Sequence, residues 1–342
     1  MRQLVLTASR EVRWAEMPAP ELRDPGDALV RPIAVALCDL DQLFVSGQMP
    51  AGGPVPLGHE FVAEVLRIGP AVSSVRPGDR VIVPFQISCG QCPRCQAGST
   101  GNCQQVPPRS MFGFATAVGG DWGGALCDLV RVPFADHMLV HVPDGIEPAA
   151  IASAGDNLPD AWRTVAPQLQ QVPGAEVLVI GGGTPSIALY AVQIARALGA
   201  SRVVYRDADP HRLELAETLG AEVAGGLPPR PSETFPVTVD CSRSREGLAF
   251  ALRSTSPGGH CTHTGILLEP ETPLPLFEMY TVGVHLHVGR AMARPAIPHV
   301  LDLIKAGQIA PELVTSRVAP WEAAAEAVAS PETKLVIVRQ QP

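Results

Sequence analysis

The sequence lacks any block of basic residues, any long uninterrupted hydrophobic run and any internal repeat. Lysine and arginine together number 26 against 34 aspartates and glutamates, which gives a formal net charge of -8. A chain of this charge without a basic cluster is not expected to bind nucleic acid or an anionic membrane surface. Segment 177–198 is apolar in places, but Gly181 to Gly183, Gln193 and Arg196 interrupt it. It therefore does not supply the roughly 20 consecutive apolar residues of a membrane span.

The composition that remains describes a globular enzyme. Hydrophobic residues make up 46% of the chain and charged residues 18%, as in an ordinary folded protein. The 342 residues exceed the size at which one core stops growing, about 250–300 residues, so we expect two domains. The first residues lack the apolar core and small residues of a signal peptide, so we expect a cytoplasmic protein.

Four closely spaced cysteines form the most informative motif. They follow the pattern C-x2-C-x2-C-x7-C at Cys89, Cys92, Cys95 and Cys103. Four thiolates can hold one zinc tetrahedrally, and such a site is structural because no position stays open for a substrate. An iron–sulfur cluster is the first alternative, but the bacterial ferredoxin run has a different last spacing. Two disulfides are the other alternative. The spacing predicts a structural zinc, which agrees with a reducing cytoplasm.

The pattern of predicted elements changes near residue 157. Residues 1–150 contain short Val/Ile/Leu runs broken by Pro and Gly, which predict a mainly β, barrel-like region with the cysteine loop as an excursion. These strands are expected at 29–36, 61–68, 80–84 and 126–133. After residue 157 strands and helices alternate, which indicates a parallel sheet with helices on both faces.

The elements predicted after residue 157 are strands at 177–180, 202–205, 237–241, 260–264 and 284–288 with helices at 187–198 and 211–219. Segment 225–236 contains four prolines where a crossover helix would usually lie, so we expect that helix to be missing or shortened. Beyond residue 295 we predict helices at 297–306 and 321–329 and a last strand at 335–338.

A glycine-rich turn follows the first of these strands and precedes a helix. It consists of Gly181, Gly182, Gly183, Thr184, Pro185 and Ser186. In the dinucleotide fingerprint the first glycine permits a tight turn, the second lets the backbone approach a pyrophosphate, and the helix N-terminus supplies N–H donors. Ser186 stands at the third glycine position. By itself this turn is also compatible with an ordinary βα connection.

An acid at the end of the next strand favours the dinucleotide interpretation. Asp207 lies where a carboxylate accepts from the hydroxyls of the adenosine ribose, and it would repel a 2′-phosphate. We therefore expect NAD rather than NADP. Arg206 and Arg212 argue in the other direction, because an arginine there could hold that phosphate.

A second metal site is suggested by Cys38 and His59. A catalytic zinc needs three protein ligands and one open position, and these two residues supply two ligands. Asp156 precedes a predicted helix and is a candidate for the third ligand, although a helix cap is the commoner role of an aspartate there. Asp41 could accept from the other ring nitrogen of His59 and fix the ring. For His260, His263, His285 and His287, in or beside predicted strands, we expect packing or solvent hydrogen bonds.

With these residues together, the chain resembles the zinc-dependent medium-chain dehydrogenases of the alcohol dehydrogenase family over nearly its whole length. The segments that carry the resemblance are Gly58-His59-Glu60 with Gly69, Gly78–Val81, the four-cysteine lobe and Val177–Ala200. Ala63 departs from the family's usual glycine. Pro133–Asp136 and Gly155–Pro159 are similar to a bacterial branch that uses Asp as the third catalytic ligand, which favours Asp156 as a ligand.

The resemblance implies an α/β protein with two domains. A GroES-like, mainly β catalytic domain would comprise residues 1–157 and 290–342, with the structural zinc lobe at 89–103, and a doubly wound Rossmann domain would comprise 158–289. It further implies two zinc ions per chain, a small alcohol, aldehyde or ketone as substrate, an active cleft between the domains, and a homodimer or homotetramer. Glu60 would lie behind the catalytic metal, and Lys334 would correspond to a basic residue near the cofactor pyrophosphate.

One departure from the family leaves alternatives open. Leu40 and Leu43 replace a hydroxyl residue and a histidine that usually pass the alcohol proton outward. The proton would then leave through water, Glu60 or Asp39. An aldehyde dismutase that holds NAD tightly is one alternative function. A nucleotide-sensing protein that has lost activity is another. Quinone reductases of this fold lack both zinc sites and are disfavoured.

Overall fold

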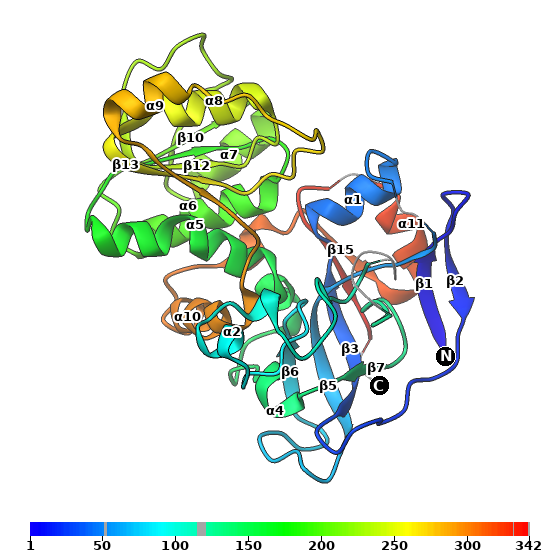
Figure 1. The fold of residues 1–342 in the computed structure, drawn as a ribbon. Coiled ribbons are helices and arrows are strands. Elements are labelled where there is room, and N and C mark those ends of the chain that lie inside the picture. The colour runs from blue at the N-terminus through cyan, green and yellow to red at the C-terminus, as the bar shows by residue number, and fades with distance from the viewer. Residues whose placement is uncertain (51–52, 115–120, 331, 341–342) are drawn as a thin grey trace. The chain divides into compact units, whose positions relative to one another are not determined.

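The computed structural model describes residues 1–50, 53–114, 121–330 and 332–340 (Figure 1). Contacts divide the chain into a first unit, 1–159 with 291–305 and 311–342, and a second unit, 160–290 with 306–310. The predicted domain boundaries, at 157 and 290, lie close to these divisions, but segment 306–310 goes to the second unit.

The first unit is built on a seven-stranded sheet in the order β15-β16-β3-β5-β6-β8, with β7 paired to β3. Only β15 and β16 are parallel to each other; the other pairs are antiparallel. A smaller sheet has the order β2-β1-β4. The bounds are β1 Arg2–Leu6, β2 Val12–Glu16, β3 Ala28–Ala36, β4 Val55–Pro56, β5 Glu60–Ile68, β6 Arg80–Val83, β7 Val130–Val132, β8 Val140–His141, β15 Arg317–Pro320 and β16 Leu335–Val338.

The helices of the first unit are short except for one near the C-terminal part. Their bounds are α1 Asp39–Ser46, α2 Pro93–Gln96, η1 Thr100–Asn102, α4 Ala135–Met138, η2 Pro148–Gly155, α10 Ala293–Lys305, η3 Pro311–Val314, η4 Trp321–Ala323 and α11 Ala324–Val328. Apolar side chains such as Val35, Phe61 and Val81 are fully buried between the strands and these helices. The mainly β architecture expected of this part is therefore present.

The second unit is a six-stranded, wholly parallel sheet in the order β11-β10-β9-β12-β13-β14. Figure 1 shows α8 and α9 on one side of it and α5 and α6 on the other. The bounds are α5 Asn157–Gln171, β9 Val177–Ile180, α6 Pro185–Ala197, β10 Val203–Asp207, α7 Pro210–Thr218, β11 Glu222–Gly225, β12 Phe235–Asp240, α8 Arg245–Arg253, β13 Thr255–His263, α9 Leu276–Val282 and β14 His285–Val288. No helix connects β11 to β12, as the prolines of that described segment predict.

Several elements differ from the sequence-based prediction. The strand expected at 126–133 is reduced to β7, because Leu126 N already donates to Leu57 O across a loop. Helix α1 was not predicted, and its N-cap is the unconventional Cys38. β1, β2, β15 and α9 were not predicted either, and the helix expected at 321–329 begins as a 3-10 turn. Among the described residues, no helix has the length and hydropathy needed to cross a membrane.

Candidate catalytic metal centre and dinucleotide turn

The structure brings Cys38, His59, Glu60 and Asp156 together in the first unit. One ligand atom of each lies within 4.8 Å of the others, and all four residues are buried. β3 and β5 cause this arrangement, because Ala36 and Glu60 face each other in their antiparallel register and Cys38 follows β3 directly. Asp156 comes from the loop between η2 and α5. The residues predicted for the catalytic zinc thus converge from three separate segments.

The charges at this cluster favour a bound cation. Burial disfavours a charged His59 imidazole, but the carboxylates of Asp41 and Asp156 outweigh it and raise the pKa of His59 to about 9. Burial, followed by the charge of Asp156, raises the pKa of the Cys38 thiol well above its usual range. The protein therefore places negative charge around a thiol that needs a positive neighbour to ionise.

The donor set fits a zinc ion. Thiolate, imidazole and carboxylate are the ligands that zinc takes, and its tetrahedral bonds of about 2.0–2.3 Å place ligand atoms about 3.3–3.7 Å apart. His59 Nε2 lies 3.4 Å from Asp156 Oδ2, within that range. Glu60 is engaged elsewhere, as described below, so Cys38, His59 and Asp156 are the three residues that would hold the metal.

Asp41 lies behind His59 but does not hydrogen-bond it. Its Oδ2 is 3.7 Å from His59 Nδ1, longer than a hydrogen bond, and the same oxygen accepts from Cys38 N at 2.9 Å. His59 Nδ1 and Asp41 Oδ1 are both buried without a hydrogen-bond partner among the described residues. Because such orphaned atoms are costly, a small rotation of the ring toward Asp41 on metal binding would satisfy both.

Glu60 and Lys334 form a fully buried ion pair beside the cluster. Lys334 Nζ donates to Glu60 Oε1 at 2.8 Å and to Leu37 O at 2.9 Å, and neither charged side chain is exposed. The other Glu60 oxygen accepts from Asn157 N at 3.1 Å, at the start of α5. Lys334 was assigned to the cofactor pyrophosphate by resemblance. Its ammonium instead lies inside the first unit, where burial leaves it no surface for a phosphate.

The four cysteines of the lobe also converge. Cys89, Cys92, Cys95 and Cys103 are buried, each offers a sulfur within 4.8 Å of the others, and all eight cysteines of the chain are free thiols. Donation from the backbone N–H of Gln104 leads the causes that lower the pKa of Cys92 to about 6, whereas burial raises that of Cys95 to about 12. Such thiols ionise together only around a cation, which fits a tetrathiolate zinc.

The glycine turn lies between β9 and α6 but uses its backbone differently from the prediction. Gly183 N donates to Ser242 O at 3.0 Å and Thr184 N donates to Cys241 O at 2.9 Å. Pro185, at the first position of α6, has no N–H to give. A Cβ on Gly183 would lie 2.3 Å from Arg243 Cβ, so this glycine permits close approach of protein backbone. Donors for a phosphate therefore start at Ser186, one turn later than the fingerprint implies.

Asp207 ends β10 as predicted, but its carboxylate is already engaged. Arg212 donates to both oxygens through Nε and Nη2 at 2.8 Å each. Tyr205 Oη donates at 2.8 Å and Asp209 N at 3.0 Å. Burial opposes ionisation, yet donation from Arg212, Asp209 N and Tyr205 outweighs it and lowers the pKa of Asp207. A ribose hydroxyl would have to share an oxygen with these donors, since a carboxylate accepts about four hydrogen bonds.

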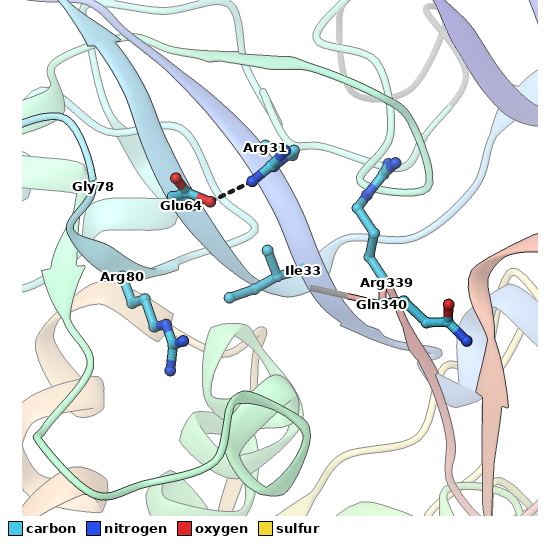
Figure 2. A pocket seen from close by; sticks show the side chains of 7 residues that line it. All are labelled: Arg31, Ile33, Glu64, Gly78, Arg80, Arg339 and Gln340. Carbon is cyan, nitrogen blue, oxygen red and sulfur yellow. Dashed lines mark hydrogen bonds and ion pairs between the residues drawn. The ribbon is translucent and has the colours of Figure 1, made fainter. Parts of the chain in front are cut away.

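Two features of the first unit were not found from the sequence. His59 packs against Phe85 and Phe114 at ring distances of 5.6 and 5.2 Å, so apolar rings border the metal ligands. Figure 2 shows a separate pocket of about 290 Å³ on the large sheet, where Arg31 of β3 contacts Glu64 of β5 at 2.6 Å. Its lining residues are Arg31, Ile33, Glu64, Gly78, Arg80, Arg339 and Gln340. None of them was predicted as a site residue, and none is a cysteine or histidine.

Comparison with known proteins agrees with these sites. The family model described as the alcohol dehydrogenase GroES-like domain matches residues 24–144. A probable zinc-binding alcohol dehydrogenase of Mycobacterium tuberculosis is 29% identical, over 96% of this chain and 85% of its own. A medium-chain reductase/dehydrogenase of Acremonium is 31% identical, over 65% and 74%. The solved alcohol dehydrogenase of Thermus sp. ATN1 is 30% identical with a TM-score of 0.89, over 99% of this chain and 100% of its own.

Proposed function

Because the chain belongs to the zinc-dependent medium-chain alcohol dehydrogenase family, we propose that it transfers hydride between an alcohol and NAD, with zinc held by Cys38, His59 and Asp156. In reverse the substrate is an aldehyde or ketone. The observation that carries the proposal is the convergence of these three donors within 4.8 Å. A closed structural zinc at the four cysteines belongs to the same proposal and gives two zinc ions per chain.

Each group has a defined task in this reaction. A zinc ion there supplies Lewis acidity that lowers the pKa of an alcohol, and the dinucleotide supplies the hydride acceptor. Asp41 orients His59 from behind, and Lys334 holds Glu60 so that it adds no unpaired charge. Phe85 and Phe114 exclude water next to His59 and favour an apolar substituent on the substrate.

The proton of the alcohol needs an exit that Leu40 and Leu43 do not offer. Both lie on α1, immediately after Cys38, and carry no group that could accept a proton. Glu60 is the nearest titratable side chain of the same cluster, and burial raises its pKa while Lys334 lowers it. We propose that the proton passes to Glu60 or to water, and that alcohol turnover is slow compared with enzymes that have a hydroxyl relay.

NAD is proposed as the preferred cofactor, on the basis of Asp207. Its carboxylate would repel a 2′-phosphate. The bidentate Arg212 neutralises part of this charge, so the preference over NADP is expected to be modest. Arg206 does not add to the same ion pair, because its Nη1 donates to Gly226 O at 3.2 Å.

A homo-oligomer is proposed from the outer edge of the parallel sheet. β14 is the last strand of that sheet, and Val288 on it is 70% exposed. In the neighbouring α9, Phe277 is 79% and Tyr280 85% exposed. An open strand edge beside large exposed apolar side chains is a surface that a second copy of the chain can cover.

The direct test is an alcohol panel read by NADH absorbance, with and without the substitution Asp156→Ala. We expect turnover of at least one alcohol and a loss of at least about a hundredfold in the variant, because a metal ligand is removed. Asp144→Ala, at an exposed loop aspartate, is the matched control. A variant that keeps both zinc ions and full turnover would remove Asp156 from the site. NAD that stays bound through gel filtration would favour the dismutase instead.

A further inference from the structure

A buried aspartate–histidine pair in the second unit has no role in the reaction described above. Asp240 and His263 are the last residues of β12 and β13 and face each other in the parallel register. His263 Nδ1 lies 2.6 Å from Asp240 Oδ2. Asp240 is fully buried and the His263 side chain is 7% exposed. A buried carboxylate is costly without donors, so this pair is a specific arrangement rather than a solvated one.

The contacts of Asp240 fix which ring nitrogen of His263 is available. Asp240 Oδ1 accepts from Ser242 N at 3.0 Å, which holds the carboxylate in place. With Nδ1–H donated to Oδ2, a neutral imidazole presents an unprotonated Nε2 as an acceptor. That Nε2 has no hydrogen-bond partner among the described residues, and it does not belong to their fully buried unsatisfied atoms. It is therefore an oriented acceptor with access to a ligand.

The position of the pair in the sheet relates it to a dinucleotide. The chain passes from β9 to β10 and β11 on one side and returns to β12, β13 and β14 on the other, so the strand order reverses between β9 and β12. Dinucleotides bind at the carboxyl ends of the strands at such a reversal. The glycine turn leaves the carboxyl end of β9, and Asp207 at the end of β10 marks the adenosine side. The other half of the ligand then lies over the ends of β12 and β13.

Further contacts connect the glycine turn to the strand ends that carry the pair. Thr184 Oγ1 lies 3.0 Å from Thr264 Oγ1, and Thr264 directly follows His263. Thr264 N donates to Asp240 O at 3.0 Å. The carbonyl of His263 already accepts from Arg163 Nη2 at 3.4 Å, so the free acceptor of this residue is its ring.

We propose that Nε2 of His263, oriented by Asp240, accepts a hydrogen bond from the nicotinamide half of a bound dinucleotide. The inference rests on the proposed dinucleotide binding. Two neutral donors of that half have the required chemistry, the carboxamide N–H and a ribose hydroxyl. His263 is thus a cofactor-positioning residue, and Asp240 acts only through it by fixing the tautomer.

The test measures dissociation constants of NADH by fluorescence for the wild type, His263→Leu, His263→Gln and Asp240→Asn. We expect binding about 3- to 10-fold weaker in His263→Leu, the range for loss of one hydrogen bond. His263→Gln should recover part of the loss, because its amide oxygen can accept. In Asp240→Asn the amide N–H can donate to Nδ1 and leave the proton on Nε2. This variant should therefore weaken NADH although the imidazole is still present.

Controls separate this role from a structural one. ADP-ribose lacks nicotinamide, so its affinity should stay within about twofold in every variant. His260→Leu, on the same strand but away from its carboxyl end, is the matched control. An analogue with acetyl in place of carboxamide distinguishes the donors. If the carboxamide donates, the wild type discriminates against the analogue and His263→Leu does not; if a ribose hydroxyl donates, both proteins discriminate equally.

Two outcomes overturn the inference, and they differ in what else falls. If the wild type binds NADH and His263→Leu binds it equally well, the pair has no role in the cofactor site and the proposed function stands. If His263→Leu weakens ADP-ribose as much as NADH, the effect is structural and the inference is wrong. If the wild type binds no dinucleotide at all, the inference and the proposed function fail together.

Discussion

Replacing Lys334 by methionine should destabilise the first unit strongly. Lys334 and Glu60 are both 0% exposed and pair at 2.8 Å, and Lys334 also donates to Leu37 O. Methionine fills a similar volume but leaves the Glu60 carboxylate buried without its counter-ion. Removing one partner of a buried ion pair costs about 3–5 kcal/mol. At about 2–4 °C per kcal/mol for a unit of this size, the first thermal transition should fall by about 6–20 °C.

The pH dependence of this loss follows from Glu60. Burial raises the pKa of Glu60 to about 7, although Lys334 offsets part of the effect. The folded state therefore binds the Glu60 proton more tightly than the unfolded chain, whose glutamate titrates near about 4.3, so this group lowers stability as pH rises through that window. Without Lys334 the pKa rises further. The destabilisation by Lys334→Met should thus be larger at pH 8 than at pH 6.

The assay is scanning calorimetry or fluorescence-detected melting in zinc-containing buffer, with two further variants. Adding Glu60→Gln to Lys334→Met removes the unpaired charge and should recover most of the loss, leaving about 1 kcal/mol for the hydrogen bonds. Lys305→Met, at an exposed lysine at the end of α10, should change stability by no more than about 0.5 kcal/mol. An unchanged melting temperature in Lys334→Met, or no recovery in the double variant, would refute the reasoning about this pair.

Three further predictions concern the lobe, the cofactor preference and the oligomer. Cys103→Ser should remove one zinc per chain and expose the lobe at 89–103 to proteolysis, because three thiolates and water hold the metal more weakly; mass spectrometry and limited trypsin digestion check this. Arg212→Gln should weaken NADP about tenfold relative to NAD, because it frees the charge of Asp207, and competition binding with Arg253→Gln as control measures the ratio. Phe277→Asp should weaken self-association at least about 30-fold, as loss of an aromatic anchor does, and light scattering after gel filtration would contradict this by showing an unchanged mass.

Local patterns in the sequence were sufficient for the elements with regular apolar runs and clear boundaries. β9 and β16 have the bounds that Val177–Ile180 and Leu335–Val338 predict. The cysteine lobe converges because its spacing is local. Cys38, His59 and Asp156 are far apart in sequence, and no spacing brings them together. Their grouping came from the resemblance to a family, and the structure shows that the register of β3 and β5 produces it.

The contacts that the sequence did not predict are all made by side chains or backbone groups distant in the chain. Lys334 reaches Glu60 across 274 positions, and no local signal indicates which buried carboxylate a lysine will find. The N–H groups of Gly183 and Thr184 donate to the chain after β12, so the fingerprint alone overstated what the turn can offer a phosphate. The Asp240–His263 pair depends on the parallel register of two strands, which periodicity does not specify.

Metal stoichiometry by native mass spectrometry tests the central claim most directly, because every step of the proposed reaction depends on a substrate-accessible zinc in addition to the sealed one. The wild type should carry two zinc ions per chain, and Cys38→Ser should carry one with its cysteine lobe still loaded. A wild type that carries a single zinc, lost on Cys103→Ser but not on Cys38→Ser, would contradict the catalytic centre.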